Sequence, residues 1–532
     1  MAVIKKGQWK APFFGKSNDY STGRDSLGLQ TTSQASYSTL LPGLTNLTNR
    51  IRYYGFYCWL LEIYAKQIGD TNQKTQNQFV RRAEYMIALI MKSENDQALQ
   101  IPGSSFASDE FNNRSEESSY DLSFGADIET GKNTYWKYSS GAFGQYYSGA
   151  MQTIGLIIHR DDSPVFVCTD IEDESIVSGT RLAKAFNKNI TEKAKNIFIK
   201  NIEQHSLNKA DVKLLFNEFS IIDIPRQSDE WLLYQQMIFS NDQPLIQNPD
   251  NKTFFRRDTF STVLSYINQA EDPKQWDMFT CELYKSKGID FHGKETKSSY
   301  GWYYYQLNEY WHFGVEAIFW SMLETLSSKY LQVPLPNLIT EFHQQMIDSI
   351  IDNSLANDEN QTFGEVIELL ELQDVWNISE KIDKAVKNDD IKTALYYGVK
   401  MLFSIYKENL SEFDKLKEFA SYNRMERNGD CIHGLEEFNL QIEISISETL
   451  KKFLIKNVIN RHLEVAYRKM GSGVKNTLKF SYEDNNIKHI ETIRPVWTTP
   501  RVYAMYRFFE DLGYINSKGN LDSIGHELIK TT

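Results

Sequence analysis

The chain has 532 residues, of which 41% are hydrophobic and 24% charged, and its net charge is −12. This length exceeds what one hydrophobic core supports, so we expect roughly three or four domains. The acidic balance argues against a protein that coats nucleic acid indiscriminately, and the aromatic content of 13% argues against general disorder.

The sequence shows no feature of export or membrane insertion. No run of apolar residues approaches membrane-spanning length, and the opening MAVIKKGQWKAPFF lacks the apolar core of a secretory signal. Cys58, Cys168, Cys281 and Cys431 are isolated and form no CxxC pair, which is typical of a reducing compartment and predicts no zinc module. We therefore expect a cytoplasmic protein with no membrane partner, no metal and no cofactor.

Charge is unevenly spread along the chain. Residues 1–50 carry 6 Lys/Arg and 2 Asp/Glu, residues 301–450 carry 11 and 26, and residues 451–532 carry 14 and 8. The protein is therefore an acidic body with basic ends. Such asymmetry indicates either that the basic ends meet an anionic partner or that they dock on the acidic middle.

The first predicted helix lies in LLPGLTNLTNRIRYYGFYCWLL, residues 40–61. Pro42-Gly43 is turn chemistry, and Thr45 or Thr48 can cap the first helical turn through its hydroxyl. Apolar side chains then occur on nearly every face, so we expect this helix to be buried.

Two arginines interrupt this apolar segment. An unpaired guanidinium in an apolar interior is costly, so Arg50 and Arg52 are predicted either to pair with internal carboxylates or to contact an anion outside the protein. We favour a structural ion pair for at least one of them. A second helix is expected at about residues 77–93.

Residues 101–133 interrupt the helical pattern. They are polar and show no periodicity, so we expect an exposed loop or linker. The chain then divides into an N-terminal helical domain (1–100), the polar linker (101–133), a winged-helix-like domain (134–190), a helical domain (191–332), an acidic helical domain (333–432), and a long basic helix with a C-terminal winged-helix-like domain (433–532).

Two segments predict the same local order of elements. In residues 146–186 a helix ends at IGLI (154–157), and a strand at VFVC (165–168) leads towards another helix. In residues 498–529 a helix ends at LGYI (512–515), and the chain resumes its apolar spacing after the turn NSKGN. Both segments resemble the winged helix-turn-helix modules of bacterial transcription regulators.

The middle of the chain is mostly helical by its periodicity. Residues 301–331 predict a long aromatic helix, and residues 335–430 predict several acidic amphipathic helices. His312 in the aromatic helix is expected to be a core histidine bonded to a neighbour rather than a ligand. The expected fold class is therefore mainly α with small β-wings, in several domains that include two winged-helix-like modules.

The segment RMERNGDCIHGLEEF contains a possible small polar site made of Arg424, Arg427, Asp430 and His433. Cys431 and His433 could form a thiol nucleophile and its base. Because they lie two positions apart and no oxyanion motif accompanies them, a polar loop without a catalytic residue is the expected reading.

A metal-dependent nuclease is the enzymatic alternative. Glu295-x-Lys297 with Asp277 upstream has the composition of D…ExK sites, in which carboxylates hold Mg²⁺ and a lysine orients water. No convincing strand precedes Glu295, so a solvated loop is expected instead. The sequence has no GxxxxGK[ST] or GxGxxG loop, which predicts that the chain alone does not hydrolyse ATP.

The basic C-terminal region supplies the candidate nucleic-acid contacts. In a DNA-binding winged helix the recognition helix enters the major groove and the wing contacts phosphate. Winged helices in large assemblies can bind protein instead. The candidate phosphate contacts are Arg501, Arg507, Lys518, Lys451, Lys452 and Lys456.

Leu41, Pro42, Gly43, Thr45 and Thr48, with the following RIRYY, match a pattern LPGx[ST]xxTxRxRY[YF]. This segment resembles the N-terminal part of uncharacterised bacterial proteins encoded beside phage-defence helicases. The resemblance covers about a tenth of the chain and implies a prokaryotic defence context, but it supplies no catalytic residue.

The expected function is that of a non-catalytic subunit of an anti-phage defence complex. Its partners would be other subunits, including an ATPase, and double-stranded DNA is a further possible partner. A kleisin-like bridging subunit of an SMC-type ATPase complex is one alternative, because winged helices at both ends of a helical middle suit that role. A metal-dependent nuclease effector is the other.

Overall fold

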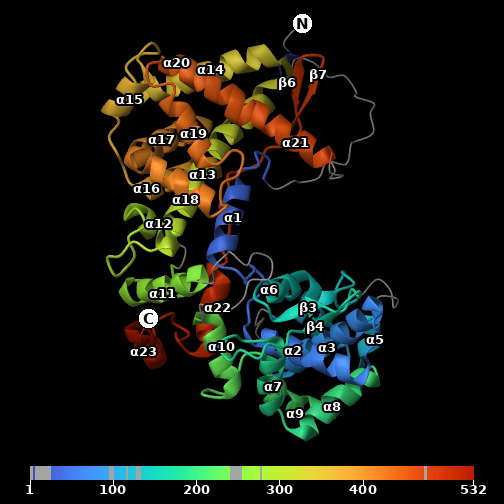
Figure 1. Ribbon diagram of the computed structural model, residues 1–532. Coiled ribbons are helices and arrows are strands. Elements are labelled where there is room, and N and C mark those ends of the chain that lie inside the picture. Colours follow the sequence, from blue (N-terminus) through green and yellow to red (C-terminus); the bar gives the residue numbers. More distant parts are fainter. Residues whose placement is uncertain are drawn as a thin grey trace. The chain divides into compact units, whose positions relative to one another are not determined.

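The computed structural model describes residues 4–5, 25–94, 101–114, 118–127, 134–239, 254–272, 274–275, 278–471 and 476–531 (Figure 1). Helix makes up 64% and strand 7%, which confirms the mainly α prediction. The chain divides into two compact units, and the six segments expected from the sequence do not coincide with them. Unit 1 comprises Met1–Ser36, Thr280–Gly288 and Gly301–Thr498, and unit 2 comprises Tyr37–Phe279, Ile289–Tyr300 and Thr499–Thr532.

Unit 2 is built from helices and two small two-stranded antiparallel sheets. Three helices cross between the units in the chain: α1 (Gln30–Leu40), α12 (Met278–Lys285) and α13 (Lys297–Lys329). The elements that belong wholly to unit 2 are α2 (Arg52–Gln67), α3 (Gln73–Glu94), α4 (Ser104–Asn113), β2 (Ser119–Asp121), α5 (Leu122–Ala126), a π-helix (Phe143–Tyr147), α6 (Ser148–Thr153), β3 (Ile157–His159), β4 (Phe166–Cys168), α7 (Gly179–Lys188), α8 (Glu192–Glu203), β5 (Ser206–Asn208), α9 (Lys209–Phe219), α10 (Asp229–Phe239), α11 (Phe254–Gln269), α22 (Val502–Leu512) and α23 (Ser523–Thr531).

Helix α2 is the centre of unit 2 and is buried along almost its whole length, as its apolar pattern predicts. It packs closely on α7 and α10, and a Cβ atom at Gly55 would lie 2.2 Å from the hydroxyl of Tyr234. The helix starts at Arg52, whereas the sequence predicted a start directly after a cap at Thr45 or Thr48. The hydroxyl of Thr48 closes a turn with the backbone of Thr45 instead of capping the helix, and Leu47 is exposed.

The polar stretch 101–133 is not one exposed loop. Its described residues form α4, β2 and α5, and strand β2 pairs with β5. Ala107, Tyr120 and Leu122 are buried, because these short elements pack on α3 and on the β5 segment. The expected linker was therefore wrong for the described residues: tertiary packing supplies burial that the local composition hides.

Unit 1 is a helical layer with one small sheet. Its own elements are β1 (Ile4–Lys5), β6 (Tyr330–Pro334), α14 (Leu335–Asp352), α15 (Phe363–Leu369), α16 (Val375–Lys387), α17 (Ile391–Asn409), a 3₁₀ turn (Leu410–Glu412), α18 (Phe413–Tyr422), α19 (Cys431–Asn439), α20 (Ile446–Phe453), a π-helix (Leu454–Asn460), α21 (Arg461–Gly471), β7 (Phe480–Glu483) and β8 (Asn486–His489).

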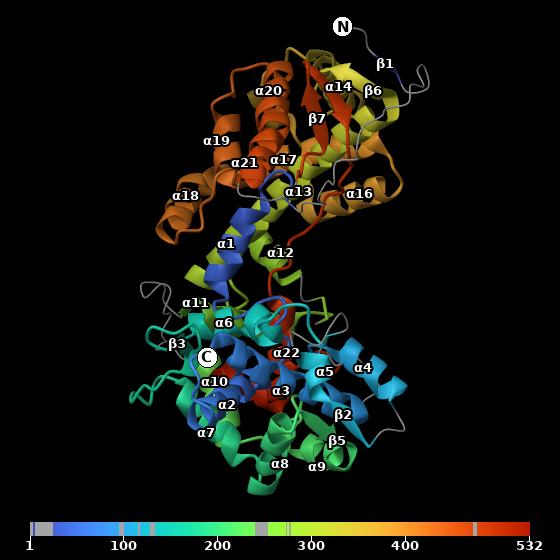
Figure 2. The same cartoon turned by 90° about the vertical axis from the view of Figure 1, so that its right-hand side faces the viewer.

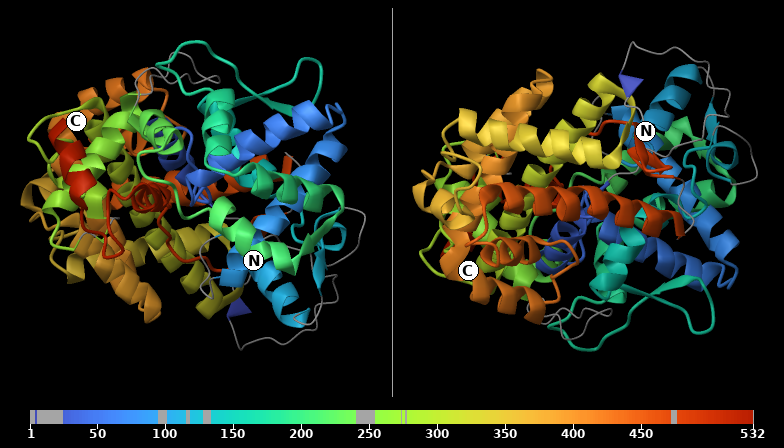
Figure 3. Two further views of the ribbon diagram at one scale, coloured as in Figure 1. Left: turned by 90° about the horizontal axis from the view of Figure 1, so that it is seen from below. Right: turned by 90° about the horizontal axis from the view of Figure 1, so that it is seen from above.

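The sheet of unit 1 has the strand order β1-β6-β8-β7, and all its pairs are antiparallel (Figure 2). Helix α14 runs alongside the continuous helix formed by α20, the π-helix and α21 (Figure 3). That long helix, Ile446–Gly471, confirms the long basic helix expected within residues 433–532.

The aromatic helix predicted at 301–331 is also confirmed, as α13. From Gly301 to Leu323 every residue of α13 is buried, including the charged Glu309 and Glu316, and aromatic side chains occur on every face of the helix. It is the central element of unit 1. Among the described residues, no helix has both the length and the apolar character that crossing a bilayer requires.

Candidate functional site

The polar segment expected around Asp430 and His433 lies in unit 1, where α18 turns into α19. The chain reverses through Arg424, at φ 57°, and Gly429, at φ 87°. Asp430 is the N-cap of α19, and its Oδ1 accepts the backbone N–H of His433 at 3.0 Å. An aspartate at this position satisfies a free helical N–H group, which explains why the helix begins here.

The structure brings Asp430 and His433 together. Oδ1 of Asp430 lies 2.6 Å from Nδ1 of His433, and Oδ2 accepts a hydrogen bond of 3.2 Å from the hydroxyl of Tyr304 on α13. Asp430 is buried, whereas the His433 side chain is 48% exposed. The buried carboxylate therefore orients the imidazole, whose Nε2 lies 3.7 Å from Oε1 of Glu426.

These contacts change the acid–base behaviour of His433. Burial lowers its pKa, but Asp430, then Glu426 and Glu436, raise it by more, so the net shift is upward from 6.5. The ring is thus cationic over a wider pH range than a free histidine. It can contact an anion or release a proton.

The same three side chains could be read as a metal centre. One ligand atom each from Glu426, Asp430 and His433 lies within 4.8 Å of the others. Asp430 is buried, and its oxygens hold the imidazole of His433 and the hydroxyl of Tyr304. We therefore interpret the group as an oriented histidine rather than as a metal centre.

Cys431 does not fit the nucleophile alternative. Its side chain is fully buried, and burial followed by the charge of Asp430 raises the pKa of the thiol well above its ordinary value. Only a thiolate is an effective nucleophile, so this thiol is inert.

The two arginines of the predicted polar site are exposed on the loop. Arg427 donates hydrogen bonds to the backbone carbonyls of Arg424 and Glu426, so it stabilises the turn. Arg461 on α21 donates a hydrogen bond of 2.6 Å to the backbone carbonyl of Asn428 and so holds the loop against α21. Sequence reasoning missed Tyr304 and Arg461 as parts of this site, because no local signal links them to residue 430.

Arg501 and Arg507, two of the candidate DNA contacts, engage internal partners in unit 2. Arg501 donates to the carbonyl of Leu41 at 3.3 Å and to Oγ of Ser38 at 3.1 Å. Burial lowers the pKa of Arg501. Arg507 forms an ion pair with Glu510. Arg501, a candidate phosphate contact, is thus half-buried and bonded within the protein.

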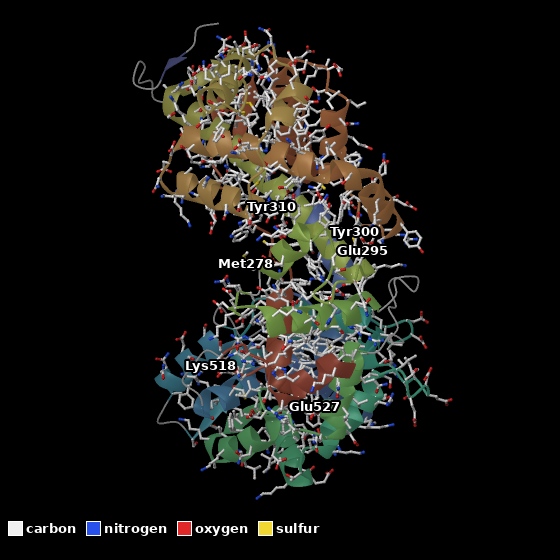
Figure 4. The ribbon with its side chains drawn as sticks, turned by 90° about the vertical axis from the view of Figure 1, so that its left-hand side faces the viewer. Met278, Glu295, Tyr300, Tyr310, Lys518 and Glu527 are labelled. Carbon is white, nitrogen blue, oxygen red and sulfur yellow. The ribbon has the colours of Figure 1, made fainter. Side chains whose placement is uncertain are left out.

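The four candidate lysines are exposed. Lys518 lies in the turn between α22 and α23 (Figure 4). Lys451, Lys452 and Lys456 lie on α20 and the following π-helix of unit 1, where Lys452 pairs with Glu448 at 2.9 Å and Lys456 pairs with Glu437. The six candidates thus belong to two different units, three to each.

The two N-terminal arginines form buried ion pairs. Nη1 of Arg50 lies 2.6 Å from Oδ1 of Asp511, and Nε of Arg52 lies 3.1 Å from Oε1 of Glu230. Arg52 also donates to the backbone carbonyl of Asp223 at 2.7 Å. Of the two alternatives left open by the sequence, the structure shows internal pairing for both arginines.

Comparisons of the chain with protein-family models, with curated proteins and with solved structures found no match. The function is therefore argued from the chain itself.

Proposed function

We propose that the protein is a non-catalytic subunit that binds a basic partner protein through the acidic unit 1. The observation that carries this proposal is a set of exposed apolar side chains at the ends of three helices. Leu440 is 82% and Leu369 64% exposed. The set, here called the leucine edge, comprises Leu369, Leu372, Leu410, Leu440 and Ile442.

The segments that carry the leucine edge contact one another. Nζ of Lys407, near the end of α17, donates to the backbone carbonyls of Glu368 at 3.0 Å and Leu370 at 2.8 Å. The hydroxyl of Tyr406 bonds Asn439 at the end of α19 at 3.2 Å. Exposed apolar groups gathered from neighbouring segments are typical of protein–protein interfaces.

The charge around the leucine edge indicates the kind of partner. Residues 301–450 have 15 more acidic than basic side chains, and Glu368, Glu371, Asp374 and Glu443 are exposed within the segments of the edge or directly beside them. Such a surface repels nucleic acid and attracts a cationic protein segment. A basic amphipathic helix has the chemistry that fits both the leucines and the carboxylates.

We further propose that residues 146–186 and 498–529 act as winged-helix-like modules. The first has the order α6, hairpin β3–β4, α7, with Ile157 opposite Cys168. The second has α22, a single bridge between Ile515 and Leu521, and α23. The common helix–hairpin–helix order supports the proposal, and the much shorter second wing favours protein contact over phosphate contact.

The assembly in which this subunit works stays a proposal drawn from the N-terminal segment. The pattern in residues 41–54 resembles proteins encoded beside phage-defence helicases, so an anti-phage complex that includes an ATPase is the expected setting. A kleisin-like bridging role belongs to the same class of function.

The nuclease alternative has weaker support. Asp277 lies outside the described residues, and Glu295 is an exposed residue in a turn closed by a single bridge to Ile289 (Figure 4). The longer strand on which a D…ExK site places its carboxylates does not occur in the described residues around Glu295.

The test compares complexes recovered from native cells with tagged chains. Leu369→Glu with Leu440→Glu should abolish co-elution of the partner and leave the circular dichroism spectrum unchanged. The matched control is Leu232→Glu, an exposed leucine of α10 in unit 2, which should retain the partner. Full co-elution with the double variant would refute the leucine edge as the interface. DNA cleavage by the purified chain with Mg²⁺ would favour the nuclease.

A further inference from the structure

Residues 496–498, here called the strap, form an extended segment that lies along α13 within unit 1. The backbone N–H of Val496 donates to Oε2 of Glu316 at 3.0 Å, and that of Thr498 donates to Oε2 of Glu309 at 2.8 Å. The strap therefore runs antiparallel to the helix. The N–H groups of alternate residues face α13, as they face a neighbouring strand in a β-sheet.

The side chain between these two backbone contacts is held by aromatic rings. Trp497 stacks on Phe313 with ring centroids 4.1 Å apart and planes 6° apart. The ring of Tyr310, labelled in Figure 4, meets it edge-on at 5.9 Å, and Trp376 of α16 lies 6.1 Å away. The Trp497 side chain is half-buried among these rings, and tryptophan is a frequent anchor residue of protein interfaces.

Thr498, the residue after the tryptophan, contacts α13 through its hydroxyl as well as through its backbone. Oγ1 of Thr498 donates to Oε1 of Glu309 at 2.8 Å and lies 2.9 Å from the hydroxyl of Tyr305. In contrast, Val496 is exposed and makes its contact with α13 through the backbone. These contacts involve the ring of Trp497 and the hydroxyl of Thr498, whereas they involve no side-chain atom of Val496.

The floor of this groove carries buried charge. Glu309 and Glu316 are almost fully buried, and His312 lies between them with Nε2 3.1 Å from Oε1 of Glu316. One imidazolium balances one of the two carboxylates, which leaves acceptor capacity for N–H donors. Buried carboxylates need such partners, and the strap supplies two backbone donors and one hydroxyl.

We propose that the groove on α13 is a peptide-recognition site for an extended segment with the sequence Trp-Thr or Trp-Ser. The chain's own strap fills this site and can be exchanged for such a peptide. The strap has the composition of a ligand rather than a core element. It belongs to no helix or strand, and its contacts are two backbone hydrogen bonds, the stacked ring of Trp497 and the hydroxyl of Thr498. Peptide-binding grooves use the same contacts in trans.

The test uses a fluorescently labelled peptide of residues 491–500, ETIRPVWTTP, and the full chain carrying Trp497→Ala to empty the pocket. The variant should bind the peptide with saturable anisotropy, and a peptide with alanine in place of tryptophan should bind at least about 10-fold more weakly. Adding Phe313→Ala should abolish binding. Failure of the folded Trp497→Ala chain to bind at millimolar peptide would overturn the proposal.

Wild-type chain provides a second measurement that does not depend on the variant's folding. Millimolar peptide should accelerate hydrogen exchange at the amides of Val496 and Thr498, because it displaces the strap that protects them. The alanine peptide should leave both rates unchanged. Equal exchange rates with and without the tryptophan peptide would show that the strap is a fixed part of unit 1.

Discussion

Helix α2 of unit 2 and helix α13 of unit 1 are both buried and aromatic, and both contain charged side chains, but they satisfy those charges differently. In α2, Arg52 meets Glu230 of another helix, α10. In α13, Glu309 and Glu316 meet backbone N–H groups of an extended segment. The partner of the first contact is a side chain held in a helix, whereas the partner of the second is the backbone of a segment outside any helix or strand, which we propose to be exchangeable.

The largest effect should come from breaking the α2 pair. Arg52→Ala should lower the free energy of unfolding of unit 2 by about 3–5 kcal/mol, because Glu230 would remain as a buried charge without its cation. Urea unfolding followed by tryptophan fluorescence would measure this change.

The control for this prediction is the ion pair of Asp229, the residue directly before Glu230. Lys188→Ala breaks an ion pair with Asp229 whose two side chains are exposed, so it should change stability by less than about 1 kcal/mol. Equal effects of Arg52→Ala and Lys188→Ala would mean that burial does not distinguish the two pairs.

A smaller effect is expected on α13. Glu309→Gln keeps the size of the side chain but removes the charge that accepts the N–H and hydroxyl of Thr498, so unit 1 should lose about 1–3 kcal/mol. The amide of Thr498 should then exchange faster, while that of Val496, bonded to Glu316, should change less. Uniform acceleration along the strap would contradict separate roles for the two glutamates.

The two regions should also respond to pH in different windows. Burial lowers the pKa of His312, but Glu316 and Glu309 raise it by more, to well above 6.5. Its contribution to stability is therefore complete below about pH 6.5 and is lost as pH rises through the folded-state pKa. His312→Gln should flatten this decline in the urea midpoint of unit 1. An unchanged pH profile would show that the imidazole does not titrate in this range.

In unit 2 the corresponding group is Asp511. Burial raises its pKa from 3.8 to about 7, against the opposing effect of Arg50. The folded state then binds this proton more tightly than the unfolded state does. The contribution of Asp511 to the free energy of unfolding should therefore decrease as the pH rises from about 4 to about 7. Asp511→Asn should remove that fall. A wild-type midpoint that rises over this interval, with the variant parallel to it, would contradict the shift.

The parts of the fold that could be predicted are those with strong local periodicity. Helix α13 and the long helix from Ile446 to Gly471 follow directly from apolar spacing. The start of α2 could not be predicted, because Thr48 is equally suited to cap a helix or to close a turn. The helices within 101–133 were missed because their burial comes from distant residues.

The same distinction applies to the sites. Asp430 and His433 lie three positions apart, so an N-cap geometry brings them together locally. Tyr304, which holds Asp430, and Thr498, which meets Glu309, are more than a hundred residues from their partners. Sequence spacing carries no information about such contacts.

The smallest effect concerns the contrast between Arg501, a half-buried charge with internal partners, and an exposed charge of the same C-terminal segment. Arg501 bonds Ser38 and Leu41, whereas Lys518 is exposed in a turn. Arg501→Ala should lower the urea midpoint of unit 2, because two internal contacts are lost, and Lys518→Glu should leave it unchanged.

If this segment contacts DNA, Lys518→Glu should also reduce the slope of log K against log salt concentration by about 0.9, the contribution of one phosphate. Arg501→Ala should not alter that slope, since its guanidinium faces the protein. Affinity for a short duplex measured over a salt series tests both variants. A reduced slope for Arg501→Ala at unchanged stability would mean that this guanidinium reaches a phosphate instead of its internal partners.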